Sequence, residues 1–145
     1  MEIKWVDTHC HLQLLNKNLD ENHYKNIEFL IIPGVDVESS SKAKEISSSL
    51  EVESYWSAGL HPHDAKLLDT QRHDLEKLFV EADLIGETGL DFYRNLSTKE
   101  EQRENFLFHL EFSKQLDKPI IIHCRDSFQD TYDLLVEFNN PSSVI

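Results

Sequence analysis

The stretch from residue 119 to residue 126 reads Pro-Ile-Ile-Ile-His-Cys-Arg-Asp. Such a short, continuous apolar run is typical of a parallel strand that is buried on both faces. Four earlier segments have a comparable length and apolar content, at residues 3–7, 29–32, 54–58 and 84–86. We therefore predict five strands, of which residues 119–123 form the last.

Polar segments with a helical pattern separate these strands. We expect helices at residues 38–50, 71–82 and 98–116, and a last helix that starts after Asp126 as its cap and ends near residue 138. Asp69 or Thr70 should cap the second helix, and Ser97 lies three residues before Glu100, which is the spacing of a capping box. The alternation of strands and helices predicts an α/β fold with a parallel sheet and right-handed crossovers.

Length and composition indicate one globular domain. The chain has 145 residues, 39% of them hydrophobic, and its two cysteines are too few for a disulfide framework. Without a signal peptide or an apolar run long enough to span a bilayer, we expect a cytoplasmic protein with no membrane partner. The net charge of −13 argues against broad attraction to nucleic acid, although bound divalent cations can invert the sign locally.

The first strand leads into a pair of histidines. Residues 7–11 read Asp-Thr-His-Cys-His, and alternation along a strand directs His9 and His11 to the same side. Two imidazoles on one side of a rigid element suit a divalent metal, whereas Cys10 should point the other way as a packed thiol. Taken alone, the pair is also consistent with two incidental polar residues that leave a strand.

Polar groups also follow the other strands, at the edge where parallel α/β folds place their active sites. His61 follows the third strand and could contact a substrate, while His63 could equally be a loop residue. Glu87 follows the fourth strand between two glycines, as a carboxylate that bridges two metals would, or as part of an ordinary acidic loop. His123 ends the fifth strand, and Arg125 two residues later could reach a phosphate.

Together these segments resemble the TatD family of metal-dependent deoxyribonucleases, within the amidohydrolase-like barrels. The resemblance runs from residue 3 to residue 145 and rests on four pieces in the family's order. These pieces are Asp-Thr-His-Cys-His at 7–11, Gly-Leu-His-Pro-His at 59–63, Ile-Gly-Glu-Thr-Gly-Leu-Asp at 85–91 and Ile-Ile-His-Cys-Arg-Asp at 121–126.

The resemblance implies a site for two divalent ions, Zn²⁺, Mn²⁺ or Mg²⁺. His9 and His11 match ligands of one metal, His123 matches a ligand of the second, and Glu87 matches the ligand that bridges them. Glu87 and His61 are therefore the expected catalytic residues. The two remaining matches, His63 and Arg125, correspond to positions that line the substrate cleft.

The resemblance also implies a partial (β/α)8 TIM-type barrel, with residues 1–145 as an incomplete hydrolase domain. The family pattern continues with a later His and Asp that have no counterpart here, and Val144-Ile145 resembles the opening of a sixth strand. The implied reaction is hydrolysis of DNA or a small phosphoester by a metal-activated water, which we expect to be impaired. The alternatives are a hydrolase of another small ester or amide, or an inactive chain that binds metal or a partner. Open sheet edges would favour self-association.

Overall fold

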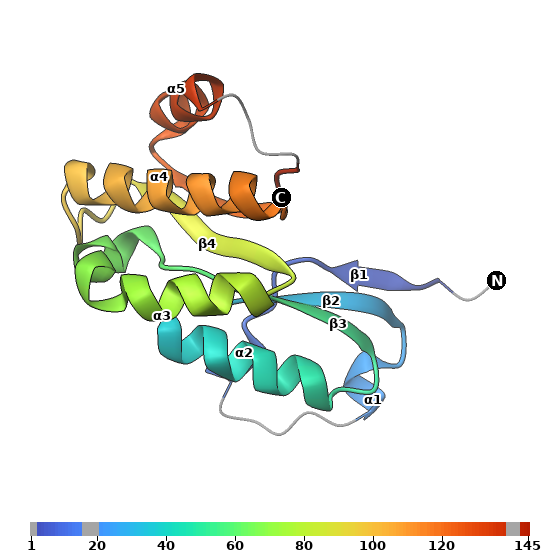
Figure 1. Ribbon diagram of the computed structural model, residues 1–145. Coiled ribbons are helices and arrows are strands. Elements are labelled where there is room, and N and C mark those ends of the chain that lie inside the picture. The colour runs from blue at the N-terminus through green and yellow to red at the C-terminus, as the bar shows by residue number, and fades with distance from the viewer. Residues whose placement is uncertain (1–2, 16–20, 139–142) are drawn as a thin grey trace.

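A computed structural model describes residues 3–15, 21–138 and 143–145. Its sheet has the strand order β1-β2-β3-β4-β5, and every neighbouring pair is parallel. The strands are β1 (Trp5–Asp7), β2 (Ile27–Pro33), β3 (Glu53–Ala58), β4 (Leu84–Asp91) and β5 (Ile120–Arg125). The sheet curls into a half-barrel with helices along its outer side, so the predicted α/β partial barrel of five parallel strands is confirmed (Figure 1).

Helices follow the strands as the crossovers of a parallel sheet require. The predicted helices are confirmed as α2 (Val37–Ser49), α3 (Leu68–Glu81), α4 (Lys99–Leu116) and α5 (Phe128–Glu137). The structure adds the short helix α1 (Glu21–Tyr24) and the 3-10 turns η1 (Leu12–Leu14) and η2 (Pro62–Leu67). In the part of the chain that the structure describes, no helix is both long and apolar enough to cross a membrane.

The cap of α4 lies one residue later than predicted. Thr98, not Ser97, accepts a hydrogen bond from the N–H of Glu101, and the Glu101 side chain accepts one from the N–H of Thr98. Ser97 is buried instead, and its hydroxyl donates to the carbonyl of His63 at 2.9 Å. This bond ties the start of α4 to the segment that follows β3.

The predicted caps of the two neighbouring helices are wrong. Because η2 runs directly into α3 at Leu68, Asp69 and Thr70 lie inside the first turn, and no side chain caps this helix. At α5 the N-cap position belongs to Ser127, which makes no side-chain cap bond, and Asp126 precedes it with φ of 52°. Serine, threonine and aspartate patterns locate a helix start only to within a few residues when the preceding turn is already helical.

The main core lies between the outer face of the sheet and helices α2 to α4. It is formed by fully buried side chains such as Ile32, Ala58, Leu60, Leu75, Phe79, Ile85, Phe106 and Leu110. A small second cluster, with Ile31, Leu84 and Ile121, lies on the opposite face. Neighbouring isoleucines in β2 and β5 thus bury opposite faces of the sheet, as a continuous apolar run predicts.

The last described residues continue the sheet beyond β5. Val144 forms a parallel bridge with Ile120, and the N–H of Ile122 donates to the carbonyl of Ile145 at 3.0 Å. The expectation that Val144-Ile145 opens another strand is confirmed to this extent. The neighbouring residues 139–142 lie outside the described part of the chain.

Candidate metal centre

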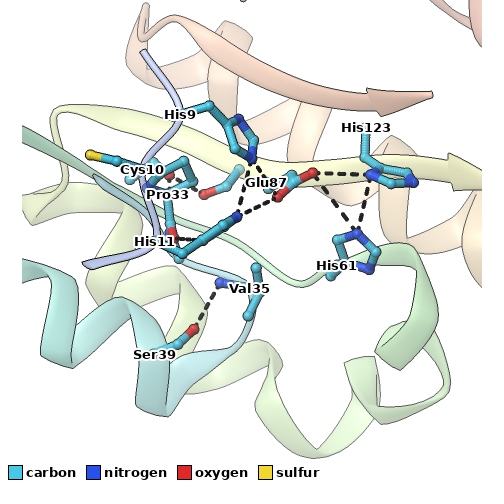
Figure 2. Close-up of polar contacts among 12 residues, drawn as sticks. His9, Cys10, His11, Pro33, Val35, Ser39, His61, Glu87 and His123 are labelled. Carbon is cyan, nitrogen blue, oxygen red and sulfur yellow. Dashed lines mark hydrogen bonds and ion pairs between the residues drawn. The ribbon is translucent and has the colours of Figure 1, made fainter. Parts of the chain in front are cut away.

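The two histidines after β1 face the same point. The Nε2 atoms of His9 and His11 are 3.1 Å apart, and Figure 2 shows both rings directed toward Glu87. The Nδ1 atom of His11 lies 3.0 Å from the carbonyl of Pro33, which can only accept, so Nδ1 carries the proton. In the neutral ring, Nε2 of His11 therefore keeps a lone pair, which is the arrangement of a metal-binding imidazole. Cys10 points away, and its thiol donates to the carbonyl of Ile31 at 3.2 Å.

Glu87 lies between two groups of histidines because of a local irregularity in β4. The pairing of β4 with β5 shifts register between Ile85 and Thr88, a bulge that redirects the side chain of the residue between them. Gly59 makes room for this segment, since a Cβ there would lie 2.3 Å from the carbonyl carbon of Gly86. The N–H of Glu87 donates to the carbonyl of Gly34 at 2.8 Å, which holds the segment in place.

The two oxygens of Glu87 serve different partners. Oε2 lies 3.2 Å from Nε2 of His9 and 3.5 Å from Nε2 of His11, whereas Oε1 lies 3.0 Å from Nδ1 of His123. Burial would raise the pKa of the Glu87 carboxyl, but hydrogen bonds with His11, His123 and His9 outweigh it and hold the pKa well below its usual range. The same hydrogen bonds raise the pKa values of His9 and His123.

Asp91 is the residue that the sequence analysis did not select. Its carboxylate is fully buried, and Oδ2 lies 2.8 Å from Nε2 of His63 and 3.0 Å from Nε2 of His123. Burial alone would raise the pKa of Asp91, but hydrogen bonds from the N–H of Arg94 and from the two imidazoles lower it to about 2. The available signal was its place four residues after Glu87 on the same strand.

The charged Asp91 determines the tautomer of His123. An ionised carboxylate can only accept hydrogen bonds, so Nε2 of His123 carries the proton and donates it to Asp91. A protonated His123 can also donate from Nδ1 to Oε1 of Glu87, whereas in the neutral ring Nδ1 keeps a lone pair that faces this oxygen. A carboxylate that orients an imidazole in this way is a common outer partner in metal sites.

His61 has the same tautomer as His123. Its Nδ1 accepts a hydrogen bond from the N–H of His63 at 3.2 Å, so Nε2 carries the proton and faces Nδ1 of His123 at 3.2 Å. Burial lowers the pKa of His61 to about 4, and the ring is therefore neutral at neutral pH. This geometry makes His61 a better hydrogen-bond donor than metal ligand.

The structure places most of the predicted site residues around one open cavity of about 380 Å³. Its lining comprises His9, His11, Val35, His61, His63, Asp64, Glu87 and His123. Arg125 is exposed, and its guanidinium carbon lies 3.9 Å from the centre of the Tyr93 ring. Its contact with a substrate stays a prediction.

The donor atoms fit divalent metals. Two groups, His9 with His11 and Glu87, and His61 with Glu87 and His123, each bring one atom per residue within 4.8 Å of the others. Imidazole nitrogens and carboxylate oxygens suit Zn²⁺ or Mn²⁺, and the buried, charged Glu87 belongs to both groups.

The family model described as "TatD related DNase" matches residues 6–145. The chain belongs to the TatD family. An "uncharacterized metal-dependent hydrolase" of Buchnera aphidicola subsp. Baizongia pistaciae is 32% identical over 96% of this TatD-family chain and 56% of its own length. The "3'-5' ssDNA/RNA exonuclease TatD" of Escherichia coli is 36% identical over 73% of the chain and 42% of its own length.

Among solved structures, the TatD homologue YJJV of Escherichia coli has a TM-score of 0.86 at 22% identity and shows the shared fold. The match covers 99% of the TatD-family chain and 59% of that structure. The chain thus spans about half the length of the curated relatives it matches, with 56% and 53% for two of them.

Proposed function

We propose that this chain carries the metal site of a TatD-family hydrolase that cleaves phosphodiester bonds in DNA or in a small phosphoester. The observation that carries the proposal is the buried Glu87, whose two oxygens face two separate groups of histidines. A charged carboxylate between two such groups suits a pair of divalent ions. The relative from Escherichia coli named an ssDNA/RNA exonuclease supports a nucleic-acid substrate.

The tautomers of His11 and His123 support a proposed set of ligands. Nε2 of His11, together with His9, would hold one ion, Nδ1 of His123 would hold the other, and Glu87 would bridge them. Zn²⁺ and Mn²⁺ suit these ligands best, and Mg²⁺ is the third candidate. When bound, such ions polarise a phosphoryl group and lower the pKa of a water molecule.

The remaining residues would act on the substrate directly. His61 is neutral and presents Nε2–H toward Glu87 and His123, so it can donate a hydrogen bond to a phosphate oxygen. His63 lines the same cavity, and Arg125 carries a positive charge that could pair with a neighbouring phosphate. Because the chain has a net charge of −13, attraction of a phosphate depends on these groups and on the ions.

The second candidate is hydrolysis of another small ester or amide on the same scaffold. The net charge of −13 favours it, because proteins that follow a DNA strand usually present a basic stripe. The cavity of about 380 Å³ is large enough for a small molecule.

We also propose contact with a further polypeptide, such as a second copy, through the open sheet edges. In β1 the side chains of Trp5 and Val6 are 63% and 49% exposed, and Val144 beyond β5 is 50% exposed. Exposed apolar side chains on an edge strand favour pairing with another chain. Sedimentation velocity over a range of concentrations tests this, and an unchanging monomer would contradict it.

The central experiment measures hydrolysis of a single-stranded oligonucleotide and of an ester and amide panel, each with Zn²⁺, Mn²⁺ or Mg²⁺. We expect metal-dependent oligonucleotide cleavage that is lost in Glu87→Gln and retained in Glu51→Gln, which changes an exposed glutamate outside the cavity. Cleavage of the panel alone would support the second candidate. Metal binding without any cleavage would identify this chain as one that only binds metal or a partner.

A further inference from the structure

Helix α4 directs three polar side chains into the protein interior. Gln102, Asn105 and His109 are each 0% exposed, and their spacing places them on one face of the helix. Burying an amide or an imidazole is unfavourable unless its polar atoms find partners, and of these three side chains Asn105 leaves its Oδ1 without one. Apolar residues at these positions would cover the sheet equally well, so packing does not explain the three polar side chains. Their hydrogen-bond partners do.

Two of the side chains hold the backbone of Leu60. Nε2 of His109 accepts a hydrogen bond from the N–H of Leu60 at 3.0 Å, and Nδ2 of Asn105 donates to the carbonyl of Leu60 at 2.7 Å. His109 is itself fixed, because its Nδ1 donates to the carbonyl of Asn105 at 2.8 Å. Burial lowers the pKa of His109 to about 4, so Nε2 stays an acceptor at neutral pH. Both backbone groups of the residue before His61 are therefore set by α4.

The third side chain holds the backbone of Asp91 in the same manner. Oε1 of Gln102 accepts from the N–H of Asp91 at 2.7 Å, and Nε2 of Gln102 donates to the carbonyl of Asp91 at 3.1 Å. Asp91 in turn accepts a hydrogen bond from Nε2 of His123 at 3.0 Å. The helix thus reaches the site along two routes, through Leu60 to His61 and through Asp91 to His123.

We infer that Gln102, Asn105 and His109 are positioning residues that hold His61 and His123 at their distances from Glu87. The inference rests on the proposed function, because it assumes that these distances matter for metal binding. A site that binds metals tightly requires its ligands to be held within roughly half an ångström. One rigid helix that fixes the backbone at two strand ends meets this requirement without touching the ligands.

The test compares His109→Phe, which cannot accept from Leu60, with His109→Gln, whose amide oxygen can. Asn105→Leu removes the donor to the Leu60 carbonyl in the same way. Ser113→Ala is the matched control, because Ser113 is also a buried polar residue of α4 but its hydroxyl donates to the carbonyl of Lys118, before β5. Any general loss of stability should appear in the control as well.

Two measurements are needed. The first records the imidazole nitrogen shifts of the metal-free chain by long-range ¹H–¹⁵N NMR. We expect the His61 and His123 signals to move in His109→Phe and Asn105→Leu and to stay in place in Ser113→Ala. The second is calorimetric titration of folded protein with Zn²⁺ and Mn²⁺. We expect a loss of affinity of about 10-fold or more, because His61 contacts His123, the proposed ligand. His109→Gln should restore the greater part of it.

Unchanged nitrogen shifts and equal metal affinities in all variants would overturn the inference. If His109→Phe does not fold, Gln102→Glu tests the second route, since it keeps the acceptor for Asp91 N–H and loses the donor. Failure of the proposed function is a separate result, namely normal metal binding by the unaltered chain without hydrolysis of the oligonucleotide. The NMR measurement decides on the positioning role even then.

Discussion

Asp91→Asn should disable one half of the metal site and leave the other intact. In the protein, Oδ2 of Asp91 accepts hydrogen bonds from His63 and His123, while Oδ1 accepts from the N–H groups of Tyr93 and Arg94. An asparagine can keep its oxygen on the two backbone groups, but its NH₂ then faces two imidazole N–H groups. We expect His123 to move its proton to Nδ1, the atom that faces Glu87.

The lowered pKa of Asp91 gives the size of the stability change expected for Asp91→Asn. The fall of the Asp91 pKa from 3.8 to about 2 corresponds to roughly 2.4 kcal/mol of preference for the charged carboxylate. This stabilisation is fully present above pH 3.8 and is lost as the pH falls through about 2, so the variant lacks it at neutral pH. Loss of an outer partner of a metal-binding histidine commonly weakens metal binding by about 10- to 100-fold.

The assay combines tautomer detection with metal titration. Long-range ¹H–¹⁵N spectra should show protonated Nε2 in His123 of the unaltered protein and protonated Nδ1 in Asp91→Asn. Calorimetry with Zn²⁺ should show one weakened site, at His123, and one unchanged site, at His9 and His11. The control is Asp83→Asn, which changes an exposed aspartate that accepts from the N–H of Trp56 at 3.0 Å.

Equal weakening of both metal sites would refute the reasoning, because the histidines that Asp91 contacts in the described part of the chain, His63 and His123, lie on one side of Glu87. An unchanged His123 tautomer with unchanged metal affinity would refute it as well. In that case the ring would be oriented by Glu87 alone.

Three further predictions concern stability. As the pH falls from 6.5 to about 4, the free energy of unfolding should fall by up to roughly 3 kcal/mol relative to His109→Gln, because His109 is protonated in the unfolded chain before it is protonated in the folded one. Urea titrations that give a pH-independent difference between the two proteins would contradict this. Lys118→Met should lower the free energy of unfolding by about 1–3 kcal/mol, since the ammonium donates to three carbonyls at the end of α3. A loss below roughly 0.5 kcal/mol in urea titrations would show that water replaces the ammonium at these carbonyls. Gly59→Ala should lower the free energy of unfolding by about 1–3 kcal/mol, because its Cβ would lie 2.3 Å from the carbonyl carbon of Gly86. An unchanged melting temperature would mean that the segments around Gly59 and Gly86 move apart easily.

Local sequence patterns predict the end of β4 too early. The strand predicted at residues 84–86 extends to Asp91, because Gly86 and Gly89 adopt positive φ values of 114° and 134° while the segment still pairs with β5. A glycine-rich stretch in a sequence is usually interpreted as a turn. The caps were misplaced for a related reason, since several adjacent polar residues compete for one position.

Strand content and parallel order follow from the sequence, since they depend on apolar runs and on the alternation of strands and helices. His9 and His11 meet as predicted, although both lie beyond β1, which ends at Asp7. Which atoms meet follows from packing. Glu87 and His123 are 36 residues apart, and their 3.0 Å contact depends on the register of β4 against β5 and on a bulge. The tautomers of His61 and His123 depend on single hydrogen bonds to His63 and Asp91. Such bonds form only within a few tenths of an ångström, a precision that residue type and spacing do not encode and that only the folded backbone supplies.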